Sequence, residues 1–108
     1  MLSSDEFDSQ FDSEEDKLYE WDEEKRKTNI LKHGLDFREV ESVFRDPYRL
    51  TMEDTRSSCD EIRFKTIGML ASKIVVVVVV HTERNEVTRI ISLRFATKKE
   101  KRLYNGNG

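Results

Sequence analysis

Three basic residues, Arg63, Lys65 and Arg94, lie in two segments whose residue pattern is typical of β-strands. Alternate residues of a strand point to the same side, so Arg63 and Lys65 share one face of the first strand. Arg94 belongs to the more polar row of the second strand. A guanidinium fork matches two phosphate oxygens and stays charged, so arginines on a rigid sheet favour a phosphate ligand. If the two strands lie near each other, we expect this cationic face to bind nucleic acid.

The chemistry that fits this face is the cleavage of RNA. RNA carries its own nucleophile, the 2′-hydroxyl, so an enzyme has only to align it, move protons and stabilise the pentacoordinate phosphorane. We assign Arg63 and Arg94 to charge stabilisation, where one preorganised donor contributes about 3 kcal/mol. Lys65, Arg84 and Arg89 are assigned to RNA binding. Arg89 falls on the apolar row of its strand, so it either sits near the sheet edge with its stem buried or is shifted by a β-bulge.

Three side chains are candidates for proton transfer: His81 and Glu83 near the rim of the sheet, and Tyr104 in the last helical segment. Each also has a structural interpretation. His81 ends a buried strand, Glu83 and Arg84 occupy a turn, and Tyr104 can pack against the sheet. The sequence therefore leaves the identity of the general base and acid open.

The strands that position these residues are marked by apolar runs. The run Ile74–Val80 is almost entirely valine, and a half-solvated strand would alternate with polar residues, so we expect a strand buried on both faces. Val87–Phe95 is predicted to be the last long strand. Shorter strands are expected at residues 18–21, 48–52 and 62–68.

Helix signals lie between the first two strands and at the C-terminal end. Asp22 can cap a first helix, which Gly34 ends in a left-handed conformation. Asp36 begins a second helix, which ends before the chain's one proline. Thr97 and Glu100 form a capping box for a short closing helix. The order predicts an α+β fold, an antiparallel meander sheet with the helices stacked on one face.

Charge divides the chain of 108 residues unevenly. Residues 1–24 hold eleven acidic residues against one lysine, whereas residues 25–108 hold eleven acidic and eighteen basic residues. We expect residues 1–17 to be a disordered acidic leader, residues 18–104 to form a single domain and residues 105–108 to fray. A basic domain behind an acidic leader fits a phosphate-binding module with a self-screening tail, or a tail that only solubilises.

Several classes of site and location are not expected. The one cysteine, Cys59, cannot form an intramolecular disulfide and fits a reducing cytoplasm. The sequence has no cluster of His, Cys, Asp and Glu with metal-ligand spacing and no Gly-rich phosphate loop, so neither a metal nor a cofactor is predicted. The acidic N-terminus does not fit a signal peptide, and the valine run is far shorter than the roughly 20 residues that span a bilayer. We therefore expect a cytoplasmic protein without membrane contact.

A series of short motifs also runs along residues 18–104. They are Tyr19-Glu20-Trp21-Asp22-Glu23-Glu24-Lys25, Asn29, Lys32-His33-Gly34, Phe37, Phe44-Arg45-Asp46-Pro47, Arg63-Phe64, Ile67-Gly68, His81-Thr82-Glu83-Arg84, Arg89-Ile90-Ile91-Ser92, Arg94, Ala96, Glu100 and Tyr104. In this order they resemble the BrnT family, and the series is more specific than any one block.

BrnT proteins are toxins of type II toxin–antitoxin systems, with a fold similar to RelE ribonucleases. The resemblance implies a metal-independent endoribonuclease that inhibits translation. It also implies a tightly bound BrnA-like antitoxin with a ribbon-helix-helix domain, and operator DNA bound only through that antitoxin. The chain departs from the family pattern in the long acidic leader before Tyr19.

Two other function classes remain open. The protein could be a non-catalytic RNA- or ribosome-binding module, which would be favoured if His81 or Glu83 lay away from the face of Arg63 and Arg94. It could also be an interaction protein whose basic face receives an acidic partner segment. A neighbouring gene with a ribbon-helix-helix pattern would favour the toxin.

Overall fold

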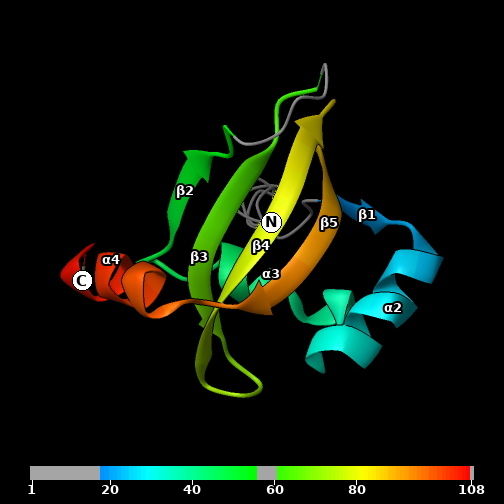
Figure 1. Ribbon diagram of the computed structural model, residues 1–108. Coiled ribbons are helices and arrows are strands. Elements are labelled where there is room, and N and C mark those ends of the chain that lie inside the picture. The colour runs from blue at the N-terminus through cyan, green and yellow to red at the C-terminus, as the bar shows by residue number, and fades with distance from the viewer. Residues whose placement is uncertain (1–17, 56–60, 108) are drawn as a thin grey trace, which may run out of the picture.

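The computed structural model describes residues 18–55 and 61–107. The predicted leader at residues 1–17 and the residue Cys59 lie outside this part of the chain. Figure 1 shows the described residues as one β-sheet with short helices around it.

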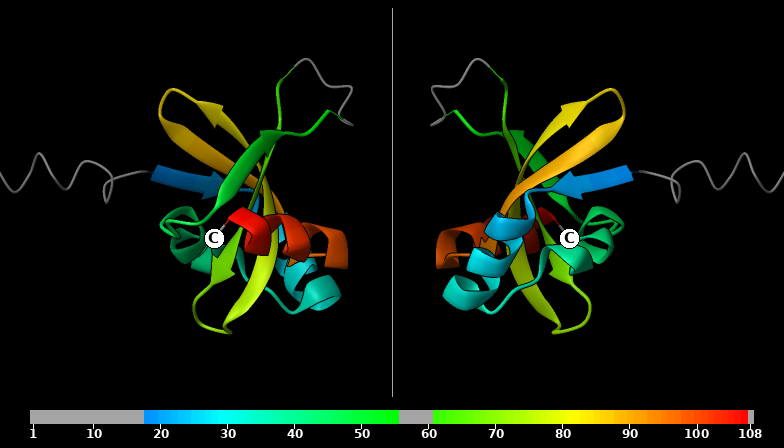
Figure 2. Two further views of the ribbon diagram at one scale, coloured as in Figure 1. Left: turned by 90° about the vertical axis from the view of Figure 1, so that its left-hand side faces the viewer. Right: turned by 90° about the vertical axis from the view of Figure 1, so that its right-hand side faces the viewer.

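The sheet is built from β1 (Leu18–Trp21), β2 (Leu50–Glu53), β3 (Phe64–Leu70), β4 (Val75–Arg84) and β5 (Val87–Phe95). Their order across the sheet is β1, β5, β4, β3, β2. β2 to β5 form the antiparallel meander that the sequence predicts, whereas β1 pairs in parallel with β5. The α+β class is therefore confirmed, and β1 adds one parallel strand to the meander. Edge-on views show how strongly the strands twist across one another (Figure 2).

The first helix, α2 (Glu23–His33), has the ends that the sequence predicts. The carboxylate of Asp22 accepts a hydrogen bond from the backbone nitrogen of Glu24 at 2.9 Å, which satisfies a donor that the helix itself cannot. Gly34 ends the helix at a φ of 71°, in the left-handed region that glycine adopts without strain.

The predicted second helix consists of two short pieces, the 3₁₀ turn η1 (Phe37–Glu39) and α3 (Glu41–Phe44). α3 packs directly onto β3 at Gly68. A Cβ at this glycine would lie 3.0 Å from Cγ1 of Val43 and 3.1 Å from its carbonyl oxygen, so no larger residue fits without movement. The closing helix, α4 (Lys98–Asn107), is longer than predicted.

The two faces of the sheet are covered by different helices. Val77 and Val79 of β4 pack against η1 and α3, whereas Val78 between them packs with Tyr104 of α4. Since neighbouring strand residues point to opposite faces, α4 lies on the face opposite to α3. The expectation that all helices stack on one face is therefore wrong. The buried valines of β4 confirm that this strand is covered on both sides.

Two buried polar side chains complete the sheet where its edge strands stop. Beyond the end of β1, the amide of Asn29 donates to the carbonyl of Leu93 at 2.8 Å and accepts from its nitrogen at 3.2 Å. Before the start of β2, the carboxylate of Asp46 accepts from the nitrogen of Met69 at 2.8 Å. Each side chain thus supplies the hydrogen bonds that a longer edge strand would make.

Candidate functional site

β5 contains a β-bulge at Ile91, the extra residue between Ser92 and Ile90, which pair with consecutive residues of β4. An extra residue reverses the alternation of side chains beyond it. Arg89 is therefore turned to the side of the sheet on which its β4 partner Thr82 lies. Of the two explanations offered for Arg89, the bulge is confirmed.

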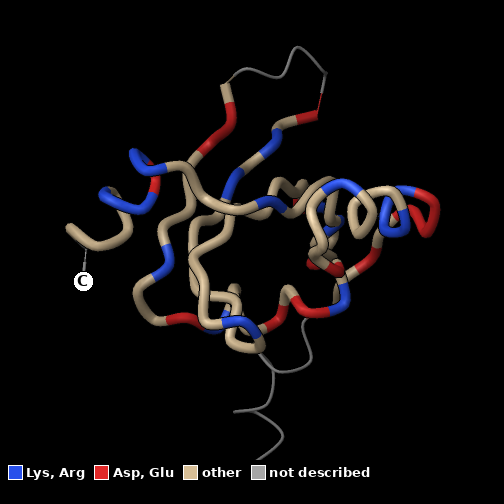
Figure 3. The backbone as a smooth tube through the Cα atoms, turned by 60° about the horizontal axis from the view of Figure 1, so that its bottom comes forward, with Lys and Arg blue, Asp and Glu red and all other residues tan. Residues whose placement is uncertain are grey.

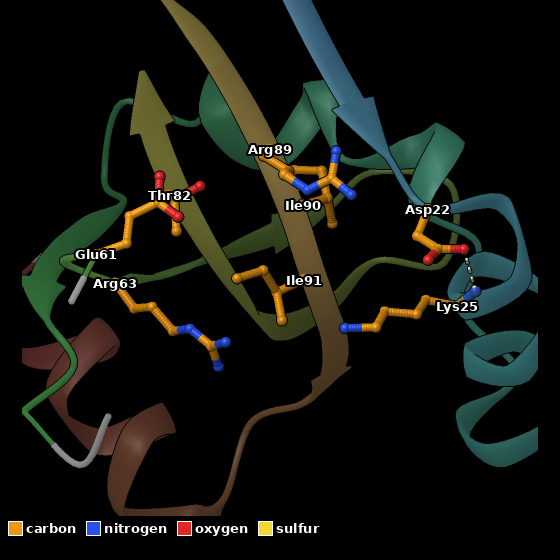
Figure 4. Close-up of a pocket in the computed structure, with 8 residues that line it drawn as sticks. All are labelled: Asp22, Lys25, Glu61, Arg63, Thr82, Arg89, Ile90 and Ile91. Carbon is orange, nitrogen blue, oxygen red and sulfur yellow. Dashed lines mark hydrogen bonds between the residues drawn. The ribbon is translucent and has the colours of Figure 1, made fainter. Parts of the chain in front are cut away.

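A pocket of about 140 Å³ lies beside this bulge (Figure 4). At about 30 Å³ per water molecule, it has room for several waters or a phosphate group. Arg63 reaches in from the segment before β3 and Lys25 from the first turn of α2, and both extend towards the space next to Ile91. This Arg63 pocket is lined by Asp22, Lys25, Glu61, Arg63, Thr82, Arg89, Ile90 and Ile91.

The cations of the Arg63 pocket are only partly neutralised. Arg89 lies 3.2 Å from the carboxylate of Glu20 at the exposed rim. Within residues 18–55 and 61–107, neither the guanidinium of Arg63 nor the ammonium of Lys25 has a hydrogen-bonding or ion-pair partner. Figure 3 shows basic and acidic residues interspersed along the chain, so the surplus of positive charge here is local. A hollow lined in this way attracts an anion more strongly than a flat surface does.

Arg94 lies on the same face as Arg63, but its guanidinium fork is occupied. Its two terminal nitrogens donate to the two oxygens of Glu100 at 2.8 and 2.9 Å, and the ammonium of Lys65 is 3.5 Å from the same carboxylate. The hydrogen bonds from Arg94 outweigh burial and hold the pKa of Glu100 at about 2. The same bonds raise the pKa of Arg94. Arg94 and Lys65 therefore hold α4 and do not reach into the Arg63 pocket.

His81 and Glu83 lie on the opposite face, beneath α3. The ring of His81 meets Phe44 edge-on with centroids 4.9 Å apart and is 2% exposed. Its Nδ1 is 2.7 Å from the carboxylate of Glu83, and its Nε2 is 2.8 Å from the hydroxyl of Thr66. Both nitrogens are thus engaged with protein groups, and the sheet separates them from Arg63.

Tyr104 of α4 is buried against the sheet, where it packs with Ile67 and Val78. Its hydroxyl donates a hydrogen bond of 2.5 Å to Asp46. Burial and this carboxylate raise the pKa of Tyr104 to about 12. Burial also opposes ionisation of Asp46, but the hydrogen bonds from Tyr104, Tyr48 and Met69 outweigh it, so the pKa of Asp46 lies below its usual value. The pair joins α4 to the loop that leads into β2.

Arg84 borders the Arg63 pocket, because its guanidinium forms an ion pair with the lining residue Glu61. This ion pair is exposed, so it contributes little to stability and leaves the carboxylate within reach of a ligand. The structure brings together three of the residues that the sequence assigns to the site: Arg63, Arg84 and Arg89. It places the other five elsewhere: Lys65, His81, Glu83, Arg94 and Tyr104.

Six residues that line the pocket were not assigned to the site from the sequence: Asp22, Lys25, Glu61, Thr82, Ile90 and Ile91. Glu61 stands two residues before Arg63, so strand alternation could have placed both on one side. The sequence carries no such signal for Thr82 or Lys25. Thr82 lines the pocket because β4 pairs with the bulged β5. Lys25 lines it because α2 follows β1 at the sheet edge.

Within the described ranges, no group of three or more His, Cys, Asp or Glu residues is placed to hold a metal ion. In the same part of the chain, no helix has the length and apolar character needed to cross a membrane.

Comparison with known families identifies the chain. A sequence model described as the ribonuclease toxin BrnT of type II toxin–antitoxin systems matches residues 21–100. The chain belongs to the BrnT family. The match to BrnT extends from the residue before the α2 cap to Glu100, so it includes every element that lines the Arg63 pocket. A search of curated proteins found no match.

Proposed function

We propose that this BrnT-family toxin is an endoribonuclease that cleaves RNA without a metal ion and so inhibits translation. Membership of a ribonuclease toxin family supports RNA as the substrate. The observation that carries the proposal is the Arg63 pocket, where two cations without a protein partner among the described residues extend towards one phosphate-sized space.

In the proposed reaction the scissile phosphate lies in the Arg63 pocket. The fork of Arg63 donates to the two non-bridging oxygens, whose negative charge grows as the phosphorane forms. Lys25 holds the same phosphate as a point charge, and Arg89 binds a neighbouring phosphate at the rim. The role of Arg63 needs a guanidinium that is not already neutralised, which favours Arg63 over Arg94, whose fork Glu100 fills.

Proton transfer is assigned to groups within the same pocket. The carboxylate of Glu61 takes the proton of the 2′-hydroxyl as that oxygen attacks phosphorus. The bond from phosphorus to the 5′-oxygen breaks, and the leaving oxygen takes a proton from the ammonium of Lys25. The products are a 2′,3′-cyclic phosphate and a 5′-hydroxyl. His81 and Glu83 receive no part in this scheme, because the sheet lies between them and Arg63.

Type II toxins are held inactive by a protein antitoxin, and we propose a BrnA-like partner with a ribbon-helix-helix domain. Operator DNA would then be bound only through that partner. The uncompensated cations of the Arg63 pocket support an acidic antitoxin segment that covers the site and excludes RNA. Since RNA and antitoxin meet in the cytoplasm, the proposal places the protein there.

A non-catalytic RNA-binding module is the second candidate function. It is favoured by the placement of His81 and Glu83 away from the arginines of the opposite face. In such a module the Arg63 pocket would bind a phosphate of RNA without breaking a bond.

The chemistry of the product separates the two candidates. RNA is incubated with the protein in EDTA, beside a matched strand that carries 2′-deoxy sugars at the cleaved positions. We expect cleavage of the all-RNA strand only, with 2′,3′-cyclic phosphate ends. An intact all-RNA strand, under conditions where the protein binds it and with ribosomes added, would contradict the enzyme and support the binding module.

A further inference from the structure

A second hollow adjoins the Arg63 pocket along the groove between α2 and β5. It encloses about 260 Å³ and shares Lys25 and Ile91 with that pocket, so a ligand can extend from one into the other. Its lining residues are Glu24, Lys25, Thr28, Asn29, Lys32, His33, Ile91 and Ser92.

The two hollows differ in chemistry. The Arg63 pocket holds three cations, which favour a phosphate, beside the carboxylates of Asp22 and Glu61 and without an aromatic side chain in its lining. The groove has two cations, Lys25 and Lys32, and one carboxylate, Glu24. To these it adds the apolar side chain of Ile91, the imidazole of His33 and the hydroxyls of Thr28 and Ser92. Flat aromatic and apolar surfaces with a few polar groups are what an unstacked base of single-stranded RNA packs against.

The shape of the groove depends on two features already described. The bulge displaces Ile91 from the regular pairing of β5, and this residue lines both hollows. The side chain of Asn29 forms two hydrogen bonds with the backbone of Leu93 at the edge of β5. The floor of the groove is therefore closed, and its backbone polar groups have partners. The groove is therefore held by buried contacts before any ligand enters.

We propose that this groove is the subsite for a nucleobase of RNA, next to the phosphate in the Arg63 pocket, and that it selects guanine. The inference rests on the proposed function, which it deepens by naming the base. Glu24 lies at the rim with its side chain 86% exposed, and its ion pair with Lys27, the one it makes within the described residues, is long at 3.9 Å. A carboxylate only accepts hydrogen bonds. Guanine alone among the four bases offers two adjacent donors on its Watson–Crick edge, N1–H and the 2-amino group.

Binding of four small probes tests this subsite on the full chain. Inorganic phosphate and the 3′-monophosphates of guanosine, adenosine and cytidine are titrated while backbone amide resonances are followed. Phosphate should perturb residues around Arg63, Thr82 and Lys25 but not Thr28 or Ser92. Guanosine 3′-monophosphate should perturb Thr28 and Ser92 as well, and should bind at least about tenfold more tightly than the other two nucleotides.

Two substitutions on the exposed surface of α2 sharpen the test, with circular dichroism confirming the fold. Glu24→Gln should remove the preference for guanine, whereas the matched control Glu53→Gln on β2, at the other edge of the sheet, should keep it. Thr28→Trp should fill the groove and reduce the affinity for guanosine 3′-monophosphate to that for inorganic phosphate. The affinity for inorganic phosphate itself should stay unchanged.

The outcomes distinguish the subsite from the proposed function. Equal affinities for the three nucleotides in the wild type would overturn the selection of guanine. Nucleotides that bind no more tightly than phosphate, with all perturbations around Arg63, would overturn the groove as a base site and leave the phosphate pocket standing. Absence of binding by phosphate and all three nucleotides would overturn both the groove and the pocket.

Discussion

Arg94 and Glu100 form a two-pronged ion pair, with hydrogen bonds of 2.8 and 2.9 Å between β5 and α4. Glu100 also accepts from the backbone nitrogen of Thr97 at 2.8 Å, so one carboxylate caps α4 and fixes the helix to the sheet. The pair neutralises an arginine whose charge would otherwise be available to RNA. It thereby distinguishes Arg94, a structural cation, from Arg63, whose side chain has no partner among the described residues.

The first prediction concerns this ion pair and pH. Because hydrogen bonds from Arg94 lower the pKa of Glu100 from 4.5 to about 2, ionised Glu100 stabilises the fold above the pKa of the unfolded chain. That stabilisation is lost as pH falls from about 4.5 towards about 2. Glu100→Gln should lower the free energy of unfolding at pH 7 by on the order of 2 to 3 kcal/mol. Urea unfolding of both proteins at pH 7 and pH 3 measures the difference, which should shrink at the lower pH. A difference that stays constant with pH would contradict the role of the charge.

The second prediction concerns Tyr104, a candidate for proton transfer whose hydroxyl is committed to Asp46. Tyr104→Phe removes a buried hydrogen bond to a charged group, so stability should fall by about 1.5 to 3 kcal/mol. RNA cleavage per folded molecule should stay within about threefold of wild type, because a phenol with a pKa of about 12 is a poor proton donor or acceptor near neutral pH. A fall of about a hundredfold in cleavage, with the fold intact, would instead place Tyr104 in the chemistry.

The third prediction concerns His81, which touches Glu83, Thr66 and Phe44 beneath α3. His81→Ala leaves a cavity and removes partners from two polar groups, so it should destabilise the protein by on the order of 2 to 4 kcal/mol. Molecules that remain folded, as counted by near-UV circular dichroism, should cleave RNA at the wild-type rate. Loss of cleavage without loss of stability would show that His81 acts in the reaction.

The fourth prediction concerns the amide of Asn29. Asn29→Ala removes two hydrogen bonds to Leu93 and one to Leu35, all buried, and the unsatisfied backbone groups should cost on the order of 2 to 4 kcal/mol. Thr28→Ala, on the exposed neighbouring position of α2, serves as the control and should change stability by less than about 0.5 kcal/mol. Similar stabilities for the two variants would mean that the backbone groups of Leu93 form other hydrogen bonds when Asn29 is absent.

The sequence was sufficient to predict the ends of α2 but not the contacts at the sheet edges. The caps at Asp22 and Gly34 act between residues close in the chain, and α2 has its predicted ends. Asn29 and Asp46 form hydrogen bonds with strands that are distant in sequence, so no local sequence pattern predicts these contacts. The parallel pairing of β1 is set by the same long-range contacts. α4 lies on the face opposite to α3 because Tyr104 packs with Val78, which is also a contact between residues distant in sequence.

The candidate site was predicted in part for a similar reason. Alternation correctly put Arg63 and Arg94 on one side of the sheet. It could not show that Glu100 would occupy Arg94, although the same glutamate was expected to cap its helix and does so through Thr97. The bulge at Ile91 moves Arg89 to the other face of the sheet. The sequence of an apolar segment does not reveal an inserted residue of this kind.

In the proposed reaction, Arg63 stabilises the phosphorane. RNA cleavage in EDTA tests this role, comparing wild type with Arg63→Ala and with Arg102→Ala, an exposed arginine of α4. All three proteins are brought to equal concentrations of folded molecule. We expect Arg63→Ala to cut at least about a hundredfold more slowly than wild type and Arg102→Ala to cut within about threefold of it. Cleavage by Arg63→Ala at the wild-type rate would rule out this role of Arg63.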